Sequence, residues 1–471
     1  MKKKEITLNI SFTVIANLLK LITSFILTIV VPRYLGVTQY GYWQLFLLYT
    51  TYMGYSYLGV ADGMYLKDGG KDYKDIDINS YSNRIKVLTI YEAILACVIT
   101  VISYFVIDDS LKVYLILWAS IDMVIYIPRQ TMKLILQATN RIKEYSISIS
   151  IFTVTNCALI CGMLLLNIRD VKYIVVIHAF TEFLSFLYTA IMCKDIWRSS
   201  PLSLKDGIKE CVDDAKIGLN VLIASAASTV SIGIIRNAIE VKWGIEEFGS
   251  VSLALSISKL FLVFINSVAV VLFPILRRIN SDRRVKLYTQ MRSVFIIPFW
   301  VIMLFYYPAK VIIGYILPQY VDALNYVTYL IPMCLFECIM ALLVNTYLKT
   351  ERKEKMLLII NVATVLISIV ATSISVEVIQ SIIAALIAIV IVIMIRTIAG
   401  EICVAKYLNI HIGKALITDV LMSVGFIAVY LLYDGLLAIV IYCLILLVYC
   451  VINKSEIFEL IDSLKVLLRK E

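Results

Sequence analysis

The chain has 471 residues, of which 61% are hydrophobic and 16% are charged, and its mean hydropathy is +0.90. A soluble domain carries about 25% charged residues, so this composition excludes a soluble globular enzyme as well as a disordered, collagen-like or coiled-coil chain. The net charge is +9. In a membrane protein an excess of Lys and Arg marks the cytoplasmic loops, so this charge does not indicate nucleic acid as a partner.

Apolar stretches long enough to cross a membrane follow one another along the whole chain. Crossing about 30 Å of hydrocarbon takes a helix of about 20 residues, whose backbone satisfies its own hydrogen bonds. The first stretch follows Met-Lys-Lys-Lys and has no small-residue cleavage site, so we expect a first span and not a signal peptide. The predicted spans are 7–32, 40–62, 87–107, 112–136, 145–167, 171–193, 215–239, 248–273, 293–316, 322–348, 355–375, 377–400, 413–433 and 435–453. The sequence therefore predicts an all-α polytopic membrane protein with about 14 transmembrane helices.

The lysines and arginines alternate between the connections of these spans. Every second connection, counted from the N-terminus and including the C-terminal tail, holds 34 of the 43 cations, and the opposite set holds 7. Because cytoplasmic loops carry the excess of Lys and Arg, both termini are predicted to be cytoplasmic. The two remaining cations are Lys20 and Lys259, at the centres of the first and eighth spans.

The two halves of the chain contain matching segments. Residues 30–33 and 40–41 match 234–236 and 248–249, and Thr139-Asn140-Arg141 matches Thr350-Glu351-Arg352. The matches fall after the first, before the second and after the fourth span of each half. Six spans per half place both halves the same way up, related by a pseudo-twofold axis along the membrane normal, as in transporters that rock one bundle against the other.

These observations predict five parts of the chain. They are an N-terminal six-helix bundle (1–193), a polar cytoplasmic linker (194–214), a second six-helix bundle (215–400), two extra helices (401–453) and a cytoplasmic tail (454–471). The apolar residues of the tail share one helical face, which favours an interfacial amphipathic helix, with binding to a partner as the alternative.

Several kinds of site have no signal in the sequence. The ten cysteines lie mostly in apolar runs without a CxxC pair, and there are two histidines, so we predict neither a redox nor a metal site. No P-loop motif is present, so we predict no cofactor and a driving force from an ion gradient or from the substrate's own gradient. The short outer connections argue against an enzyme.

Lys20 and Lys259 carry the functional prediction. An ionisable group at mid-membrane normally faces a bundle interior or a water-filled cavity. The two lysines either line a cationic cavity that holds an anionic substrate, or form structural ion pairs with acids on other spans. Such acids are available as Asp122, Glu182 and Glu337.

Other ionisable residues leave similar alternatives. His178 and Glu182 are four residues apart on one helical face, a spacing suited to a proton relay or to a local hydrogen bond. Asp122, His178, Glu182 and Glu337 are therefore candidates for ion coupling or for charge partners. Arg33 and Arg236 are predicted at equivalent outer ends of the first and seventh spans, where they either guide an anionic substrate or anchor a helix end to lipid phosphates.

Three segments resemble a known family. They are Pro32–Gly36 with Tyr40–Trp43, Leu136–Lys143, and the outer turn Leu317–Ala323 leading to Pro332. Together with the number of spans, they resemble the polysaccharide or O-antigen repeat-unit flippases of the multidrug/oligosaccharidyl-lipid/polysaccharide exporter superfamily. The resemblance extends over nearly the whole chain. Lysine stands at 20 and 259 where the family frequently has arginine, and Pro318 stands where it often has glycine.

The resemblance implies two paired bundles around a cationic lumen, with Lys20 and Lys259 on spans that line it. It implies transport of undecaprenyl-diphosphate-linked oligosaccharide repeat units to the outer leaflet of the bacterial cytoplasmic membrane, for O-antigen, capsule or exopolysaccharide. The lipid-linked oligosaccharide and membrane lipids are the implied partners, with a polysaccharide polymerase and other assembly proteins as further candidates.

Two alternatives remain at this stage. An ion-coupled drug or cation antiporter of the same superfamily should have a net acidic cavity, for which Asp122, Glu182 and Glu337 are available. A membrane glycan polymerase or ligase would need catalytic residues on an outer loop, and the short outer loops disfavour it.

Overall fold

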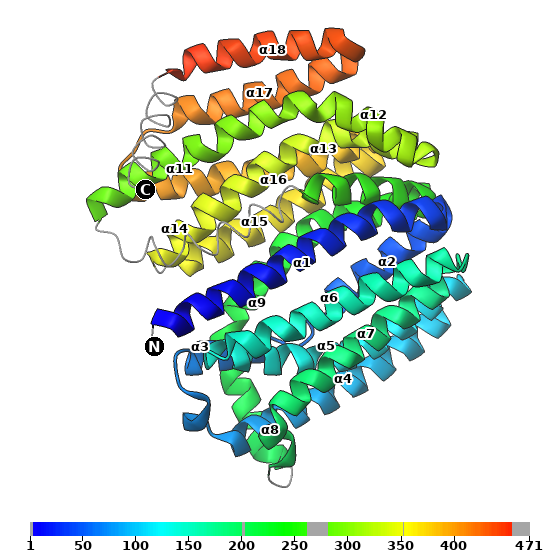
Figure 1. Ribbon diagram of the computed structural model, residues 1–471, viewed down its shortest axis with the longest axis vertical. Coiled ribbons are helices and arrows are strands. Elements are labelled where there is room, and N and C mark those ends of the chain that lie inside the picture. Colours follow the sequence, from blue (N-terminus) through cyan, green and yellow to red (C-terminus); the bar gives the residue numbers. More distant parts are fainter. Residues whose placement is uncertain (1–2, 200–202, 261–280, 352, 455–471) are drawn as a thin grey trace. The chain divides into compact units, whose positions relative to one another are not determined.

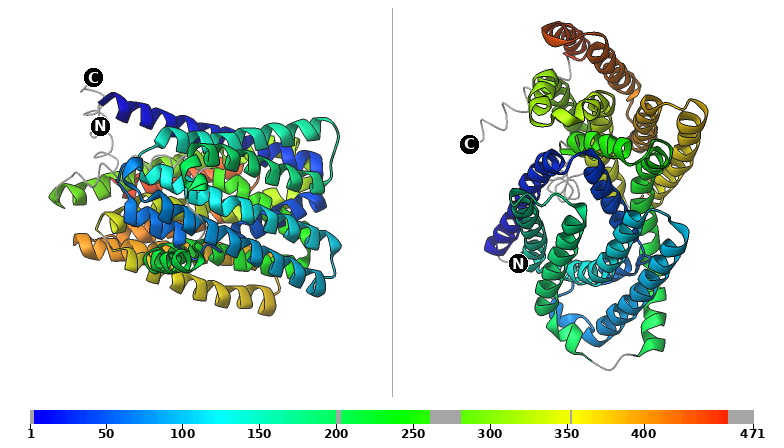
Figure 2. Two further views of the ribbon diagram at one scale, coloured as in Figure 1. Left: turned by 90° about the horizontal axis from the view of Figure 1, so that it is seen from below. Right: turned by 90° about the vertical axis from the view of Figure 1, so that its right-hand side faces the viewer.

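A computed structural model gives the fold, and we describe residues 3–199, 203–260, 281–351 and 353–454 (Figure 1). Every regular element among these residues is a helix. The predicted amphipathic tail, apart from its first residue, and the second half of the predicted eighth span lie outside the described residues. The helices of the N-terminal part run alongside one another in two orthogonal views (Figures 1 and 2).

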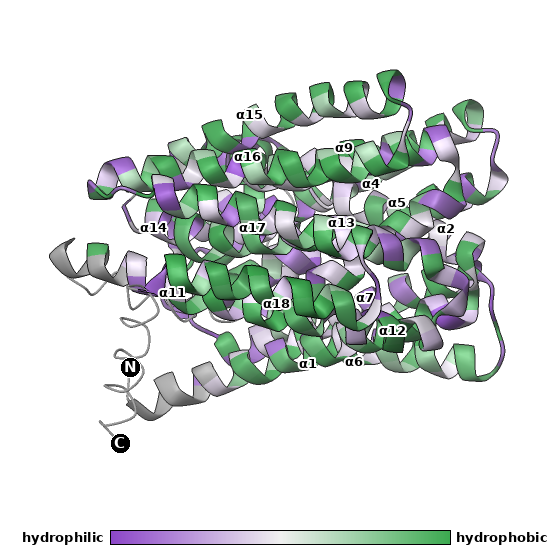
Figure 3. Ribbon diagram, turned by 90° about the horizontal axis from the view of Figure 1, so that it is seen from above, coloured by the Kyte–Doolittle hydropathy of each residue, from purple (hydrophilic) through white to green (hydrophobic). Residues whose placement is uncertain are grey.

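Twelve stretches of the described residues are long and apolar enough to cross a membrane, which confirms the prediction of an all-α polytopic protein. The predicted second span (40–62) is interrupted after residue 53, so its continuous helix is shorter than predicted. Of the predicted eighth span (248–273), the described part is helical and belongs to a helix over residues 245–260. In Figure 3, α15 and α18 are hydrophobic over most of their length. The α-helices are α1 (Lys3–Leu35), α2 (Val37–Met53), α3 (Val60–Asp68), α4 (Ile78–Val106), α5 (Ser110–Ala138), α6 (Ile142–Leu165), α7 (Val171–Met192), α8 (Lys194–Arg198), α9 (Leu204–Trp243), α11 (Ser281–Ile302), α12 (Tyr306–Ile316), α13 (Val321–Ile339), α14 (Asn345–Thr350), α15 (Glu354–Thr372), α16 (Ile382–Leu408), α17 (Gly413–Leu432) and α18 (Gly435–Ile452).

The described chain forms two compact units. Unit 1 comprises residues 1–233 and 243–252, and unit 2 comprises residues 234–242 and 253–471. The boundary between the units does not lie in the predicted linker (194–214). Helix α9 begins within that linker, and its residues up to Gly233 belong to unit 1. The two predicted six-helix bundles therefore stay a prediction.

In unit 1, aspartates start the spanning helices. The Asp77 carboxylate accepts a hydrogen bond from the backbone N–H of Ser80 at the start of α4, and Asp109 and Asp170 cap α5 and α7 in the same way. A capping carboxylate satisfies backbone donors that the first turn leaves without a partner. Helix α4 then packs on α5, α5 on α7 and α1 on α6.

The predicted second span is two helices, α2 and α3, with a break at residues 54–59. Two successive residues of the break, Leu58 and Gly59, have positive φ of 53° and 80°, a conformation that is costly for a leucine. Helix α9 packs closely on α3 beside the break. A Cβ atom at Gly63 would lie 1.9 Å from the Asp214 carbonyl oxygen, so only glycine permits this approach.

One of the predicted repeats is visible as a structural motif. Gly36 and Gly244, which are 244 − 36 = 208 residues apart, both have positive φ, and each immediately precedes a helix. Gly41 and Gly249, at the same spacing, pack against each other within unit 1. The motif therefore supports the internal repeat that the sequence predicts.

Unit 2 is built on α13 and α16, which pack on each other, with α15 against α16 and α17 against α18. The two extra helices are attached by aromatic and ionic contacts. Tyr306, Phe426, Tyr430 and Tyr442 form a cluster with ring centroids 4.9–5.7 Å apart. The Tyr442 hydroxyl donates to the Trp300 carbonyl oxygen at 3.0 Å.

Candidate functional site

Within unit 1, α5 and α7 hold a buried group of charges. Arg129 of α5 forms an ion pair with Glu182 of α7, and the exposed fractions of these residues are 4% and 1%. Arg129 Nη1 also donates to Ser185 Oγ at 3.0 Å. One turn earlier on α7, His178 Nδ1 lies 3.3 Å from Asp122 Oδ1 of α5. His178 and Glu182 therefore bind residues of α5, and neither donates to the other.

His178 lies among aromatic rings. The rings of Phe46 and Phe152 meet it edge-on with centroids 5.3 Å away, and Trp43 does so at 5.8 Å. Asp122 is the polar partner of the imidazole in this apolar surrounding. The sequence pattern could not show this arrangement, because α2, α5, α6 and α7 each contribute one part of it.

Two lysines of unit 1 lie near this group without an ion-pair partner among the described residues. Lys133, one turn after Arg129 on α5, interacts electrostatically with Arg129, Glu182 and Lys20. Lys20 of α1 is exposed rather than buried. Arg129, Lys133 and Lys20 thus outnumber Asp122 and Glu182, three cations to two acids.

A corresponding group lies in unit 2. Arg396 Nη2 of α16 lies 2.7 Å from Glu337 Oε1 of α13, and the Arg396 side chain is 2% exposed. Lys259 interacts electrostatically with Glu337, Arg236 and Arg396. It forms no ion pair with any residue that the structure describes. Three cations therefore meet one acid in this group.

The acids Asp122, Glu182 and Glu337 are thus bound by His178, Arg129 and Arg396. No ion pair joins these acids to Lys20 or Lys259 among the described residues, although Lys259 interacts electrostatically with Glu337. Whether the two lysines line a cavity for an anionic substrate or serve the internal structure stays a prediction.

The two arginine–glutamate pairs are related by the internal repeat. Arg129 and Glu337 are 337 − 129 = 208 residues apart, the spacing of the glycine motif, and each lies on the predicted fourth span of its half. Their partners, Glu182 and Arg396, lie on the sixth spans. The same pair of spans is therefore joined by an ion pair in both units, with the charges exchanged.

Sequence reasoning missed three cations of these groups and a fourth, Arg292, elsewhere in unit 2. The count of loop charges assigned Arg129, Lys133, Arg292 and Arg396 to cytoplasmic connections, whereas they lie within α5, α11 and α16. Arg292 is buried between α16 and α17, where it pairs with Glu401 at 3.1 Å and with Asp419. An acid on a neighbouring span is the signal that could have found them.

The predicted outer arginines differ in their surroundings. Arg33 is exposed in the last turn of α1. Arg236 is half-buried, seven residues before the end of α9, and belongs to the Lys259 group. Their roles at a substrate entrance therefore stay a prediction, and the equivalence of their positions is only approximate.

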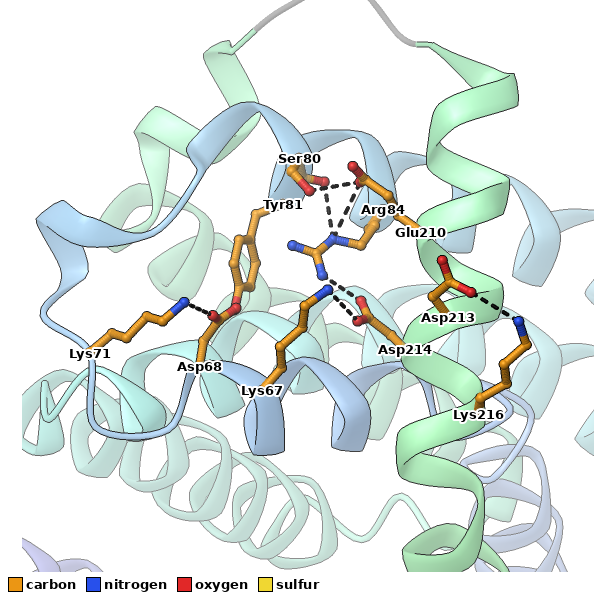
Figure 4. A network of polar contacts seen from close by, with 10 residues as sticks. All are labelled: Lys67, Asp68, Lys71, Ser80, Tyr81, Arg84, Glu210, Asp213, Asp214 and Lys216. Atoms are coloured by element: carbon orange, nitrogen blue, oxygen red, sulfur yellow. Dashed lines mark hydrogen bonds and ion pairs between the residues drawn. The ribbon is translucent and has the colours of Figure 1, made fainter.

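A second polar network joins α3, α4 and α9 at the end of unit 1 that the loop charges predict to be cytoplasmic (Figure 4). Arg84 of α4 pairs with Asp214 and lies 3.7 Å from Glu210, both on α9, and Lys67 lies 3.5 Å from Asp214.

Beside this network, burial raises the pKa of Asp68, but the hydrogen bonds from Lys71 Nζ, at 2.5 Å, and from the Tyr81 hydroxyl outweigh it and lower the pKa below its ordinary value. Asp68 is therefore an anion that holds α3, α4 and the loop after α3 together.

The described residues contain no group of three His, Cys, Asp or Glu side chains suited to a metal ion.

No family model matches the chain, and no curated protein matches it. Solved structures match its fold. An inward-facing multidrug resistance MATE family transporter of the MOP superfamily shares 15% identity over 83% of this chain and 98% of that chain, with a TM-score of 0.59.

The lipid II flippase MurJ in an inward closed conformation shares 14% identity over 96% of this chain and all of that chain (100%), with a TM-score of 0.57. An outward-facing MATE family transporter shares 15% identity over 85% of this chain and 95% of that chain, with a TM-score of 0.53. The protein is therefore a multi-pass membrane protein with the fold of MOP superfamily transporters.

Proposed function

We propose that the protein is a flippase that moves undecaprenyl-diphosphate-linked oligosaccharide repeat units across the bacterial cytoplasmic membrane. It works by alternating access, with both termini in the cytoplasm, and serves the synthesis of a surface polysaccharide such as O-antigen, capsule or exopolysaccharide. A polysaccharide polymerase is the expected partner that consumes the translocated unit. The shared fold with MurJ, whose structure is described as that of a lipid II flippase, supports this class of substrate.

One observation carries the proposal: the acids of the two charge groups, Asp122, Glu182 and Glu337, already have partners, whereas Lys20, Lys133 and Lys259 have no ion-pair partner among the described residues. Arg129, His178 and Arg396 bind Glu182, Asp122 and Glu337. Lys20, Lys133 and Lys259 form no ion pair within the described chain. An uncompensated cation inside a membrane protein is costly unless it meets water or an anionic ligand. A diphosphate supplies the opposite charge.

The chemistry of the substrate fits this division of charge. The diphosphate is too polar to cross hydrocarbon alone, while its polyisoprenoid chain is as apolar as the lipid around it. In the proposal, Lys20 and Lys259 bind the diphosphate part way across. The glycan stays in water within the protein, and the chain stays in the bilayer.

A drug or cation antiporter is the competing proposal. Such a protein needs a carboxylate free to bind a cationic substrate. Asp122, Glu182 and Glu337, the acids on which this alternative depended, each hold a cationic or imidazole partner instead. This pairing favours an anionic substrate at the two groups that contain these acids.

Reconstitution tests the substrate class. The purified protein is placed in proteoliposomes with a fluorescent polyprenyl-diphosphate oligosaccharide, and its translocation is followed by the access of a membrane-impermeant quencher. A lipophilic cationic dye is tested in parallel, with protein-free vesicles as the control. The proposal expects translocation of the diphosphate lipid and none of the dye. Export of the dye without movement of the diphosphate lipid would overturn it in favour of the antiporter.

A further inference from the structure

Glu92 is a buried carboxyl group that the proposed function does not use. It is residue 15 of the 29 in α4, so it lies about 21 Å along the helix from either end at about 1.5 Å per residue. Its exposed fraction is 0%. Leu88 and Ala96, one turn to each side, belong to a buried apolar cluster with Met123 and Ile127 of α5. Glu92 therefore faces the packed interior of unit 1 and not lipid.

No cation of the described residues compensates Glu92. Its one polar contact with a described residue is with Ser56, whose Oγ lies 2.6 Å from Glu92 Oε2, and Oε1 has no hydrogen-bond partner there. Among the described residues, no lysine, arginine or histidine forms an ion pair with it. Each of the other buried acids of the spanning helices discussed above has a cationic or histidine partner. Glu92 has none among the described residues.

The geometry around Ser56 fits a protonated Glu92. Ser56 Oγ is 2.6 Å from Glu92 Oε2 and 2.7 Å from the Met53 carbonyl oxygen. Both distances are those of O–H···O hydrogen bonds, but a serine hydroxyl has one hydrogen and can donate to only one of the two oxygens. A protonated Glu92 supplies a second hydrogen. It donates to Ser56 Oγ, and Ser56 donates to Met53, which satisfies both contacts.

Ser56 lies in the break of the second span, between α2 and α3. The break contains Leu58 and Gly59 with positive φ. It also packs on α9, where a Cβ atom at Gly218 would lie 2.0 Å from the Gly59 carbonyl oxygen. The carboxyl group of Glu92 therefore contacts a segment that has two positive φ angles and packs on another spanning helix.

The other titratable groups near Glu92 are neutral or have partners of their own. Tyr91, its neighbour on α4, is the group that interacts with it electrostatically. Tyr57 of the break donates to Asp62 of α3 at 2.8 Å, and Tyr126 of α5 packs in the same cluster. None of them supplies a positive charge that would hold Glu92 as an anion.

We propose that Glu92 is a proton-binding site of the transport cycle, occupied when Glu92, Ser56 and Met53 form the observed chain of hydrogen bonds. Release of the proton to water leaves a carboxylate that cannot stay buried without a cation. The break at residues 54–59 must then move to admit water, which couples proton release to a conformational change. The coupling rests on the proposed function, whereas the proton site does not.

Infrared difference spectroscopy of the purified protein tests the site without any substrate. The wild type is expected to show at neutral pH the carbonyl stretch of a protonated carboxyl group, which shifts in Ser56→Ala and is absent in Glu92→Gln. Glu377→Gln, which removes an exposed carboxylate on another helix, should leave the band unchanged. Persistence of the whole band in Glu92→Gln, or its absence from the wild type, would overturn the site.

Proteoliposomes then test the coupling. A pH gradient is expected to accelerate translocation of the diphosphate lipid by the wild type and by Glu377→Gln. Glu92→Gln, a mimic of the protonated state, should fold and exchange substrate without responding to the gradient. An equal response in Glu92→Gln, or a response of the wild type to sodium in place of protons, contradicts the coupling. Failure of the wild type to move the lipid at all refutes the proposed function but leaves the spectroscopic result standing.

Discussion

Glu337 is bound by Arg396, with 2.7 Å between Oε1 and Nη2, and not by Lys259. The arginine is therefore the ion-pair partner of this acid, and Lys259 interacts with it only electrostatically. The same division of roles occurs in unit 1, where Arg129 takes Glu182 and leaves Lys20 and Lys133 without an ion pair among the described residues. In both units an arginine forms the buried ion pair, and in our proposal the lysines bind the ligand.

The first prediction concerns the buried pair of Arg129 and Glu182. Arg129→Met should destabilise the protein by about 3–5 kcal/mol, because it leaves the Glu182 carboxylate buried without a partner. The double variant Arg129→Met/Glu182→Met should recover most of this loss. Thermal unfolding of the single and double variants in detergent measures both effects. Equal losses in the single and double variants would show that the pair has no such structural role.

The second prediction concerns the approach of α3 to α9. Gly63→Ala places a methyl group 1.9 Å from the Asp214 carbonyl oxygen, so backbone must move, at a cost of about 1–3 kcal/mol. Gly162→Ala in α6 is the matched control, because nothing lies within 4 Å of its added Cβ atom. It should be neutral or stabilise by up to about 1 kcal/mol. Melting temperatures that fall equally in both variants contradict the close packing.

The third prediction concerns acid pH. The pKa of Asp68 is lowered in the folded protein because Lys71 and Tyr81 donate to its carboxylate more strongly than burial opposes it. Its contribution to stability is therefore present above the ordinary aspartate value of about 3.9 and is lost as the pH falls through the lowered value. Asp68→Asn should melt below the wild type at pH 7, with the difference shrinking below about pH 4. A difference independent of pH would show that this carboxylate is not held as an anion.

The fourth prediction separates a flippase from a cation antiporter. The double variant Glu337→Gln/Arg396→Gln removes both charges of the buried pair and leaves Lys259 in place. A flippase for an anionic lipid should retain translocation, since the diphosphate does not need Glu337. An antiporter that binds its cation at Glu337 should lose transport. Loss of translocation of the diphosphate lipid by the folded double variant is the outcome that contradicts our account.

The fold was predictable from the sequence because hydropathy and loop charge are local properties. The repeat could be found for the same reason, since Gly41 and Gly249 lie in matching segments, and the structure gives them a physical role in helix contact. Asn140, in the matching Thr-Asn-Arg segment, has a φ of +61° just after α5. An asparagine tolerates this conformation, which explains its presence at that turn.

The candidate site was less predictable because its members meet across helices. The count of loop charges could not distinguish Arg129 or Arg396, paired with an acid on another helix, from a cation in a loop. The spacing of His178 and Glu182 indicated a shared face but not that both would bind α5. Glu92 gave no signal either, because its role depends on a serine 36 residues away in the break between α2 and α3.

The translocation rate of lysine variants tests the central claim most directly. The double variant Lys20→Gln/Lys259→Gln and the control Lys216→Gln, an exposed lysine of α9 that pairs with Asp213, are compared with the wild type in proteoliposomes. All should have similar melting temperatures. We expect the double variant to move the polyprenyl-diphosphate oligosaccharide at least about tenfold more slowly, equivalent to about 1.4 kcal/mol, and the control to match the wild type. A double variant that moves it at the wild-type rate would contradict the binding of the diphosphate by these lysines.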